Sequence, residues 1–107
     1  MSIYYPYSAS DGKHKYYIIT KNGKKVNFGA AGYDDYTTHK DPLRKERYLA
    51  RHKNNENWGK SGIDTAGWFS RWLLWEEPNI KDAYRKTKKK LLKWGFISRE
   101  QYNQYVF

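Results

Sequence analysis

Several common stabilising devices are scarce or missing in this chain. It contains no cysteine, only three prolines, and 11 acidic residues against 21 basic ones. Without cysteine, neither a disulfide framework nor a thiolate metal site can form. No apolar run approaches the ~20 residues that a membrane-spanning helix needs, and residues 1–7 lack the basic and then apolar pattern of a signal peptide. We therefore expect an intracellular chain with no membrane partner.

Aromatic residues replace the aliphatic residues that the chain lacks. Hydrophobic residues make up 38% of the 107 positions, but aromatic residues make up 19%, with five Trp and 11 Tyr. A chain of this length is the size of one domain. We therefore predict a single domain over residues 1–107 with an aromatic-rich core, built mainly from Trp58, Trp68, Phe69, Trp72, Trp75 and Trp94.

The net charge of +10 is concentrated in two segments. Residues 81–93 hold seven Lys or Arg and one acid, and residues 39–60 hold seven and three. Residues 61–80, between them, hold one basic residue and three acids. Such clustering indicates a polyanionic or acidic partner more strongly than the total charge does.

The N-terminal part of the chain predicts an arm and a hairpin. Residues 1–12 are rich in tyrosine and end in a turn-forming stretch, which is typical of an irregular arm. Residues 14–28 contain two β-prone runs separated by Asn22-Gly23, a pair that suits a type I′ turn. The arm could dock onto its own domain or onto a neighbouring subunit, which would make an oligomer.

The remaining part, residues 38–107, predicts three or four short helices. Thr38 or Asp41 can cap the first, and Asn79 and Ser98 can cap later ones. The hairpin followed by helices defines an α+β fold, with the hairpin packed against the helices. The expected helices run from Pro42 to Lys53, from Ala66 to Trp75, from about Ile80 to Gly95, and after Ser98.

The third of these helices carries the densest positive charge. Its basic side chains occupy most of the circumference that does not face the core, so a phosphate backbone would relieve their mutual repulsion. The simpler alternative is a solvated helix face. The candidate nucleic-acid contacts are Lys81, Arg85, Lys86, Lys88, Lys89, Lys90 and Lys93.

A second candidate surface lies on the first predicted helix. Arg44, Arg47 and Arg51 follow one another at helical spacing and form one stripe, so their guanidinium groups could hold phosphates in a bidentate manner. The alternative is internal pairing of these arginines with carboxylates. The candidate acids are Asp34, Asp35, Glu56, Glu76 and Glu77.

Catalytic and cofactor motifs are missing from the sequence. His39, Asp41 and His52 lack the spacing of a zinc site, and no nucleophile stands near them. The segment Gly29–Gly32 lacks the residues that complete a phosphate loop. We therefore predict no catalytic residue, no metal, no cofactor and no small-molecule substrate, and a nuclease using His39 and His52 remains a minor alternative.

An ordered string of motifs between Val26 and about Lys81 resembles a family of short, uncharacterised proteins from large DNA viruses of eukaryotes, bacteriophages and environmental viral sequences. Its segments include His39-Lys40-Asp41, Arg47-Tyr48-x-x-Arg51-His52 and Thr65-Ala66-Gly67-Trp68-Phe69-Ser70-Arg71-Trp72. Gly67-Trp68-Phe69 stands where the family has Gly-Phe-Trp, and both orders fill a core with rings.

The resemblance implies a viral origin and no established enzymatic activity. It also suggests a structural polar knot in which His39, Asp41, Arg47 and His52 fix a loop to the helix that follows. The leading hypothesis is a small non-enzymatic viral module that contacts nucleic-acid phosphates without reading sequence. The alternative is a virion structural protein, in a minor capsid or internal shell, that binds acidic protein surfaces. Both place the chain in the infected host cell or in the virion.

Overall fold

The sheet contains the hairpin that the sequence predicts, as seen in a computed structural model that describes residues 2–107. Strands β2 (His14–Ile19) and β3 (Lys25–Ala30) pair antiparallel. The predicted type I′ turn is wrong, because that turn needs positive φ at both central residues, whereas of Asn22 and Gly23 only Gly23 has it, at +84°. The Thr20 N–H donates to the Lys24 carbonyl at 2.8 Å. This pair continues the hairpin by one step, so the turn itself consists of residues 21–23.

The N-terminal arm is more ordered than the sequence suggested. Its strand β1 (Tyr7–Ser8) pairs with β2 and makes a three-stranded sheet in the order β1-β2-β3. Tyr4 is buried, and its hydroxyl donates to Asp64 Oδ1 at 2.9 Å. The ring of Tyr5 meets that of Tyr84 with centroids 5.6 Å apart. The arm thus docks onto its own chain.

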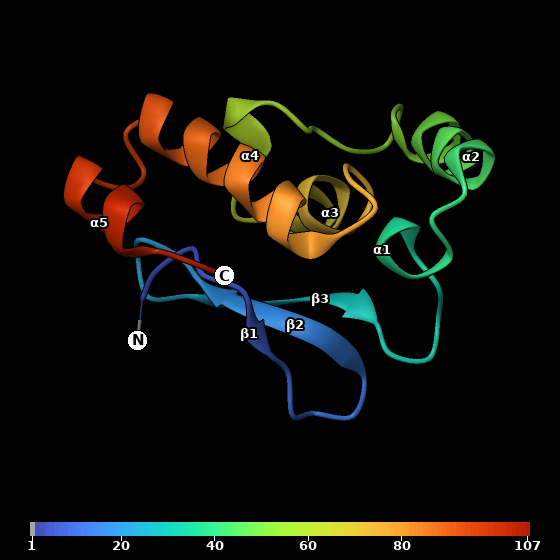
Figure 1. The fold of residues 1–107 in the computed structure, drawn as a ribbon, viewed down its shortest axis with the longest axis horizontal. Helices are drawn as coiled ribbons and strands as arrows, with labels where there is room; N and C mark the ends of the chain where they lie inside the picture. Colours follow the sequence, from blue (N-terminus) through green and yellow to red (C-terminus); the bar gives the residue numbers. More distant parts are fainter. Residues whose placement is uncertain (1) are drawn as a thin grey trace.

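Helices cover one face of the sheet, and the core lies between the two layers (Figure 1). Rings supply much of this core, since Tyr4, Phe28, Trp68, Phe69 and Tyr84 are all buried. The α+β class and the aromatic-rich core are therefore confirmed. None of the helices in residues 2–107 is long and apolar enough to cross a bilayer.

The central helical segment changes its winding halfway. It begins as α3 (Ala66–Phe69), with Thr65 as N-cap, and continues as the π-helical segment η2 (Ser70–Leu74). The predicted helix from Ala66 to Trp75 is thus present but is not one continuous α-helix. A π turn carries more residues per turn than an α turn. Leu73 and Leu74 are buried with Trp68, while Trp72 and Trp75 remain partly exposed.

Two C-terminal helices begin at the predicted caps. Helix α4 (Ile80–Lys93) is capped by Asn79, and α5 (Arg99–Gln104) has the capping box of Ser98 and Gln101. Tyr105 lies in the core, whereas Val106 is 77% exposed, because the chain is extended after α5 and successive side chains point to opposite sides.

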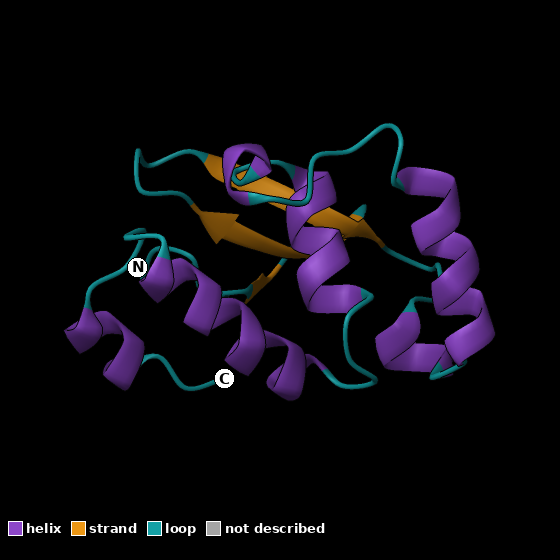
Figure 2. Ribbon diagram, turned by 90° about the horizontal axis from the view of Figure 1, so that it is seen from above, coloured by secondary structure: helices purple, strands orange, loops and turns teal. Residues whose placement is uncertain are grey.

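Two further α-helices lie at one end of the molecule, beyond the end of β3 (Figure 2). A short helix, α1 (Tyr36–His39), is closed by a capping box of Asp35 and Thr38. Asp41 then caps α2 (Pro42–His52), as the sequence allowed. A 3₁₀ turn, η1 (Lys60–Gly62), follows in the loop before α3. Helix α2 therefore projects from the main body of the protein.

Gly29 fixes how closely β3 approaches the π-helical segment. Its φ is +74°, and an added Cβ would lie 2.7 Å from Leu74 Cδ1. Gly32 has a similar φ of +83°, but an added Cβ there would meet nothing within 4 Å. We predict that Gly32→Ala costs about 1 kcal/mol of unfolding free energy from backbone strain alone, and that Gly29→Ala costs about 1–3 kcal/mol more from overpacking.

Urea denaturation of the two variants measures this difference, because both changes introduce the same side chain at a left-handed position. Equal losses of stability would contradict the close packing of β3 on Leu74.

Candidate anion-binding surfaces

The basic side chains of α4 form two rows on its outer surface. The first row, Lys81, Arg85 and Lys88, borders a hollow of about 330 Å³ that is closed by the C-terminal tail. Lys88 Nζ donates to the Tyr105 carbonyl at 2.6 Å and lies 4.5 Å from the Tyr102 ring centroid. Burial lowers the pKa of Lys88, and the nearby charge of Arg85 lowers it further. This row is thus partly engaged with the tail.

The second row faces the loop before α4. Its members Lys86, Lys89, Lys90 and Lys93 surround Glu76. Lys86 Nζ pairs with Glu76 Oε2 at 3.3 Å and also with Glu77, and Lys90 Nζ lies 4.1 Å from a Trp72 ring centroid. Of the seven candidate residues on α4, three are exposed and make no hydrogen bond or ion pair within residues 2–107: Lys81, Lys89 and Lys93.

The arginine stripe of α2 lies at the surface. Arg44, Arg47 and Arg51 are all exposed. Arg44 Nη1 lies 3.9 Å from Asp34 Oδ2, with both side chains about half exposed or more. Such a pair contributes little energy. Arg47 and Arg51 make no hydrogen bond or ion pair in the described part of the chain. Internal carboxylates therefore do not pair with most of this stripe.

Glu76 lies between the two basic helices. It pairs with Arg71 Nη1 at 2.9 Å, with Lys45 of α2 at 3.8 Å and with Lys86 of α4 at 3.3 Å. Burial is the largest single effect on its pKa and raises it, but Arg71, Lys45 and Lys86 together outweigh burial and lower the pKa below its ordinary value. A carboxylate therefore interrupts the positive charge between α2 and α4.

The residues of the suggested polar knot are only partly brought together. The Asp41 N–H donates to His39 Nδ1 at 2.9 Å at the start of α2. His52 lies at the other end of α2, where its Nδ1 is 3.9 Å from Glu56 Oε1, and Arg47 is exposed and has no hydrogen-bond or ion-pair partner among residues 2–107. A hydrogen bond thus joins two of the four residues.

A stack of rings connects the two histidines in place of polar contacts. Tyr48 of α2 lies face to face with Trp75, with centroids 4.1 Å apart and planes 1° apart. His39 lies 5.3 Å from Trp75, and His52 lies 4.4 Å from Tyr48. This stack joins α2 to the end of the π-helical segment.

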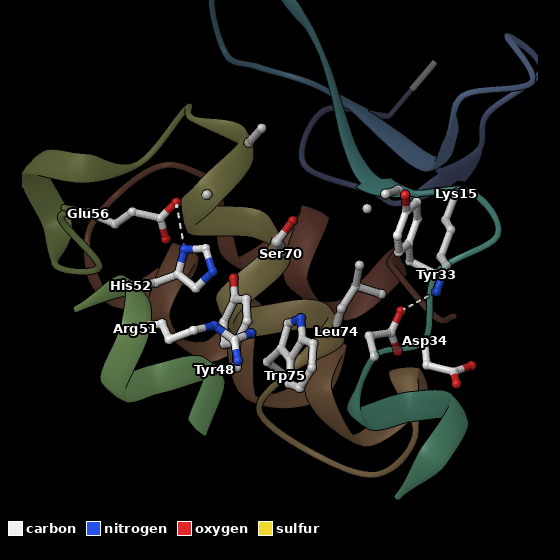
Figure 3. A pocket seen from close by; sticks show the side chains of 15 residues that line it. Lys15, Tyr33, Asp34, Tyr48, Arg51, His52, Glu56, Ser70, Leu74 and Trp75 are labelled. Carbon is white, nitrogen blue, oxygen red and sulfur yellow. Dashed lines mark hydrogen bonds and ion pairs between the residues drawn. The ribbon is translucent and has the colours of Figure 1, made fainter. Parts of the chain in front are cut away.

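A cleft of about 450 Å³ opens beside this stack, between α2 on one side and β3 and α3 on the other (Figure 3). A second hollow of about 310 Å³ is lined by Arg44 and Arg47. The two hollows share Tyr33, Asp34, Arg51 and Trp75. They therefore form one depression, with the arginines of α2 along one rim.

The acids of the cleft already have partners. Asp35 accepts from the Thr37 N–H at 2.9 Å and pairs with Lys15 Nζ at 2.5 Å. Glu56 accepts from Trp58 Nε1 at 2.9 Å. Asp34 accepts from the Thr38 hydroxyl at 3.2 Å, in addition to its contact with Arg44. Each acid of the cleft is thus engaged by an internal donor, and Asp34 and Asp35 are also paired with a cation.

Several donors in the same cleft have no partner. Tyr48 and Ser70 point their hydroxyl groups toward the cavity (Figure 3), and neither makes a hydrogen bond within residues 2–107. Burial raises the pKa of Tyr48 to about 12, with a smaller contribution from the charge of Glu56, so its phenol stays protonated at neutral pH. Arg51 adds a guanidinium group. The larger hollow therefore offers unpaired donors, and the arginines of α2 add positive charge along the rim, where Arg44, Arg47 and Arg51 line the smaller hollow with one acid, Asp34.

Sequence reasoning identified the arginines of this cleft and named its acids as possible partners for them, but it did not identify the hydroxyl groups and the exposed ring that complete the cleft. Tyr33, Tyr48 and Ser70 lie on three separate segments, and nothing in their spacing links them. The helical spacing of Tyr48 and Arg51 placed both on α2, which was the one available signal. No group of three or more His, Asp or Glu residues in residues 2–107 is arranged to hold a metal ion.

Comparison with known protein families gives a match to the N-terminal part of the chain. A profile described as "Family of unknown function (DUF5754)" matches residues 7–52, which is less than half of the 107 residues. The match covers the sheet, α1 and α2 and stops at His52. It therefore starts earlier and ends earlier than the resemblance from Val26 to Lys81. The searches of curated proteins and of solved structures found no match.

The position of Glu76 predicts a pH-dependent contribution to stability. Its pKa in the folded state is below the ordinary value of 4.5, so its stabilising effect is present above that value and is lost as the pH falls through the folded-state pKa. We expect Glu76→Gln to lower the free energy of unfolding by about 1–3 kcal/mol at pH 7.

The variant should also lose less stability than the parent protein on acidification. Denaturant titrations at pH 7 and at successive acidic pH values measure both effects. Parallel stability curves for the two proteins, with a constant gap, would contradict this assignment.

Proposed function

We propose that this chain is a small non-enzymatic module that binds nucleic-acid phosphates by charge, without reading sequence, through the outer surface of α4. The main support for this proposal is a group of unpaired lysines on the outer surface of α4. Lys81, Lys89 and Lys93 are exposed and have no acidic partner within residues 2–107. Lysine side chains of this kind neutralise phosphates and release counterions.

The arginine stripe of α2 supports the same proposal as a second contact. Arg47 and Arg51 make no ion pair with any of the described residues 2–107. Because Glu76 stands between the two helices, we expect α2 and α4 to contact separate stretches of a polyanion. The viral setting suggested by the motif resemblance would place such a module in an infected cell or in a virion.

A virion structural protein that binds acidic protein surfaces is the competing proposal. It would use the same face of α4. Its second element, an aromatic arm that joins subunits, has less support, because the rings of Tyr4 and Tyr5 pack within the chain itself. Mass spectrometry of purified particles distinguishes the two proposals, since a shell component is expected at high copy number.

The α4 proposal predicts a salt-dependent affinity that one set of substitutions weakens. For the triple variant Lys81→Gln, Lys89→Gln, Lys93→Gln, we expect the slope of log K against log salt concentration on duplex DNA to fall by about 2–3, since each phosphate contact contributes about 0.9. Fluorescence anisotropy with a labelled duplex of arbitrary sequence measures this slope.

A matched control keeps the net charge equal. Lys13, Lys21 and Lys24 are exposed on loops of the sheet, and their replacement by Gln removes the same charge away from α4. The proposal requires the control to keep most of the slope. It is wrong if both triple variants lose the slope equally, or if the unmodified protein does not bind DNA or RNA at about 50 mM salt.

A further inference from the structure

We propose that the cleft between α2 and the body of the protein binds a nucleoside phosphate, with the phosphate held by Arg47 and Arg51 and the base stacked on Tyr33. This site adds to the proposed function of α4. It shares Arg47 and Arg51 with the second contact of that proposal, but it is tested separately from the α4 surface, which has no residue in common with the cleft and lies on the other side of Glu76.

The hydrogen-bonding groups of the cleft select the ligand. Its acids are occupied by Lys15, Trp58 and neighbouring groups, whereas Tyr48, Ser70 and Arg51 have donors without partners inside residues 2–107. A ligand that brings acceptors and negative charge completes these bonds. A ligand that brings only donors leaves them unmade, which is costly in a partly desolvated site.

The arginine geometry favours a phosphate over a carboxylate. Arg47 and Arg51 stand one helical turn apart on the same face of α2, and both line the smaller hollow. A phosphate monoester offers three terminal oxygens, enough to engage both guanidinium forks. A carboxylate has two oxygens, which one arginine already satisfies.

The opposite wall of the cleft supplies a free aromatic surface. Tyr33 is 74% exposed and lines both hollows, across the cleft from Tyr48 and Arg51 (Figure 3). No aromatic ring within residues 2–107 stacks on it. An exposed ring near a phosphate-binding group is how proteins hold unstacked bases. The cavity volume of about 450 Å³ lies in the range of small-ligand sites, about 300–1,000 Å³.

Isothermal titration of the whole chain with AMP tests this site, with adenosine and inorganic phosphate as partial ligands. We expect saturable 1:1 binding of AMP and weaker binding of each partial ligand. The double variant Arg47→Gln, Arg51→Gln should weaken AMP binding at least about tenfold, and Tyr33→Ala should weaken it roughly 5- to 150-fold. Tyr33→Phe, which keeps the ring, should retain the affinity.

Two controls separate this site from general charge. Lys53 and Lys60 are exposed and lie outside the cleft lining, so replacing both by Gln should leave AMP binding unchanged. The α4 triple variant should also bind AMP normally. If the α4 triple variant loses duplex binding but still binds AMP, the two sites are independent. Each proposal can then be rejected without rejecting the other.

The source of the nucleoside phosphate is resolved with oligonucleotides. A short single strand with a 5′-phosphate that binds more tightly than AMP and than its 5′-hydroxyl counterpart identifies a nucleic-acid end as the ligand, and equal binding of AMP identifies a free nucleotide. The proposal is overturned by any of three results: no saturable AMP binding, inorganic phosphate or a phosphoserine peptide binding as tightly as AMP, or an unchanged affinity in the double arginine variant.

Discussion

The face-to-face contact between Tyr48 and Trp75 determines how α2 sits on the rest of the protein. The two rings are 4.1 Å apart and nearly parallel, and His39 and His52 extend the stack at its ends. Helix α2 is otherwise poor in buried side chains, since Tyr48 is the only one within it. This aromatic contact and the bonds of Lys45 to Glu76 hold the helix against the body, and the cleft lies beside the stack.

The scarcity of aliphatic residues also explains the charged surface of α4. With few aliphatic residues available, Tyr84, Thr87 and Leu91 occupy the inner side of the helix, and the outer side is left for charge. Carboxylates compensate this charge only locally, at Asp82, Glu76 and Glu77. Positive charge therefore accumulates on the side of α4 that no acid of residues 2–107 reaches.

Local signals in the sequence predicted much of the fold. The features that depend on contacts between distant segments could not be predicted from it. The caps at Asp41, Asn79 and Ser98 located three helices because a capping side chain acts within its own turn. The π turn after Phe69 and the burial of Tyr4 depend on tertiary packing, which spacing does not reveal. The cleft also joins distant segments, so its arginines were predicted as a stripe and its acids as their possible partners, whereas Tyr33, Tyr48 and Ser70 were not predicted to share a site.

If the unpartnered donors beside the Tyr48–Trp75 stack form a site for a phosphorylated nucleoside, AMP should occupy it in a crystal of the complex. We expect such a crystal structure to show a phosphate within hydrogen-bond distance of Arg47 and Arg51 and a base lying on the ring of Tyr33. Nucleotide found only against the lysines of α4, with none in the cleft, would contradict it.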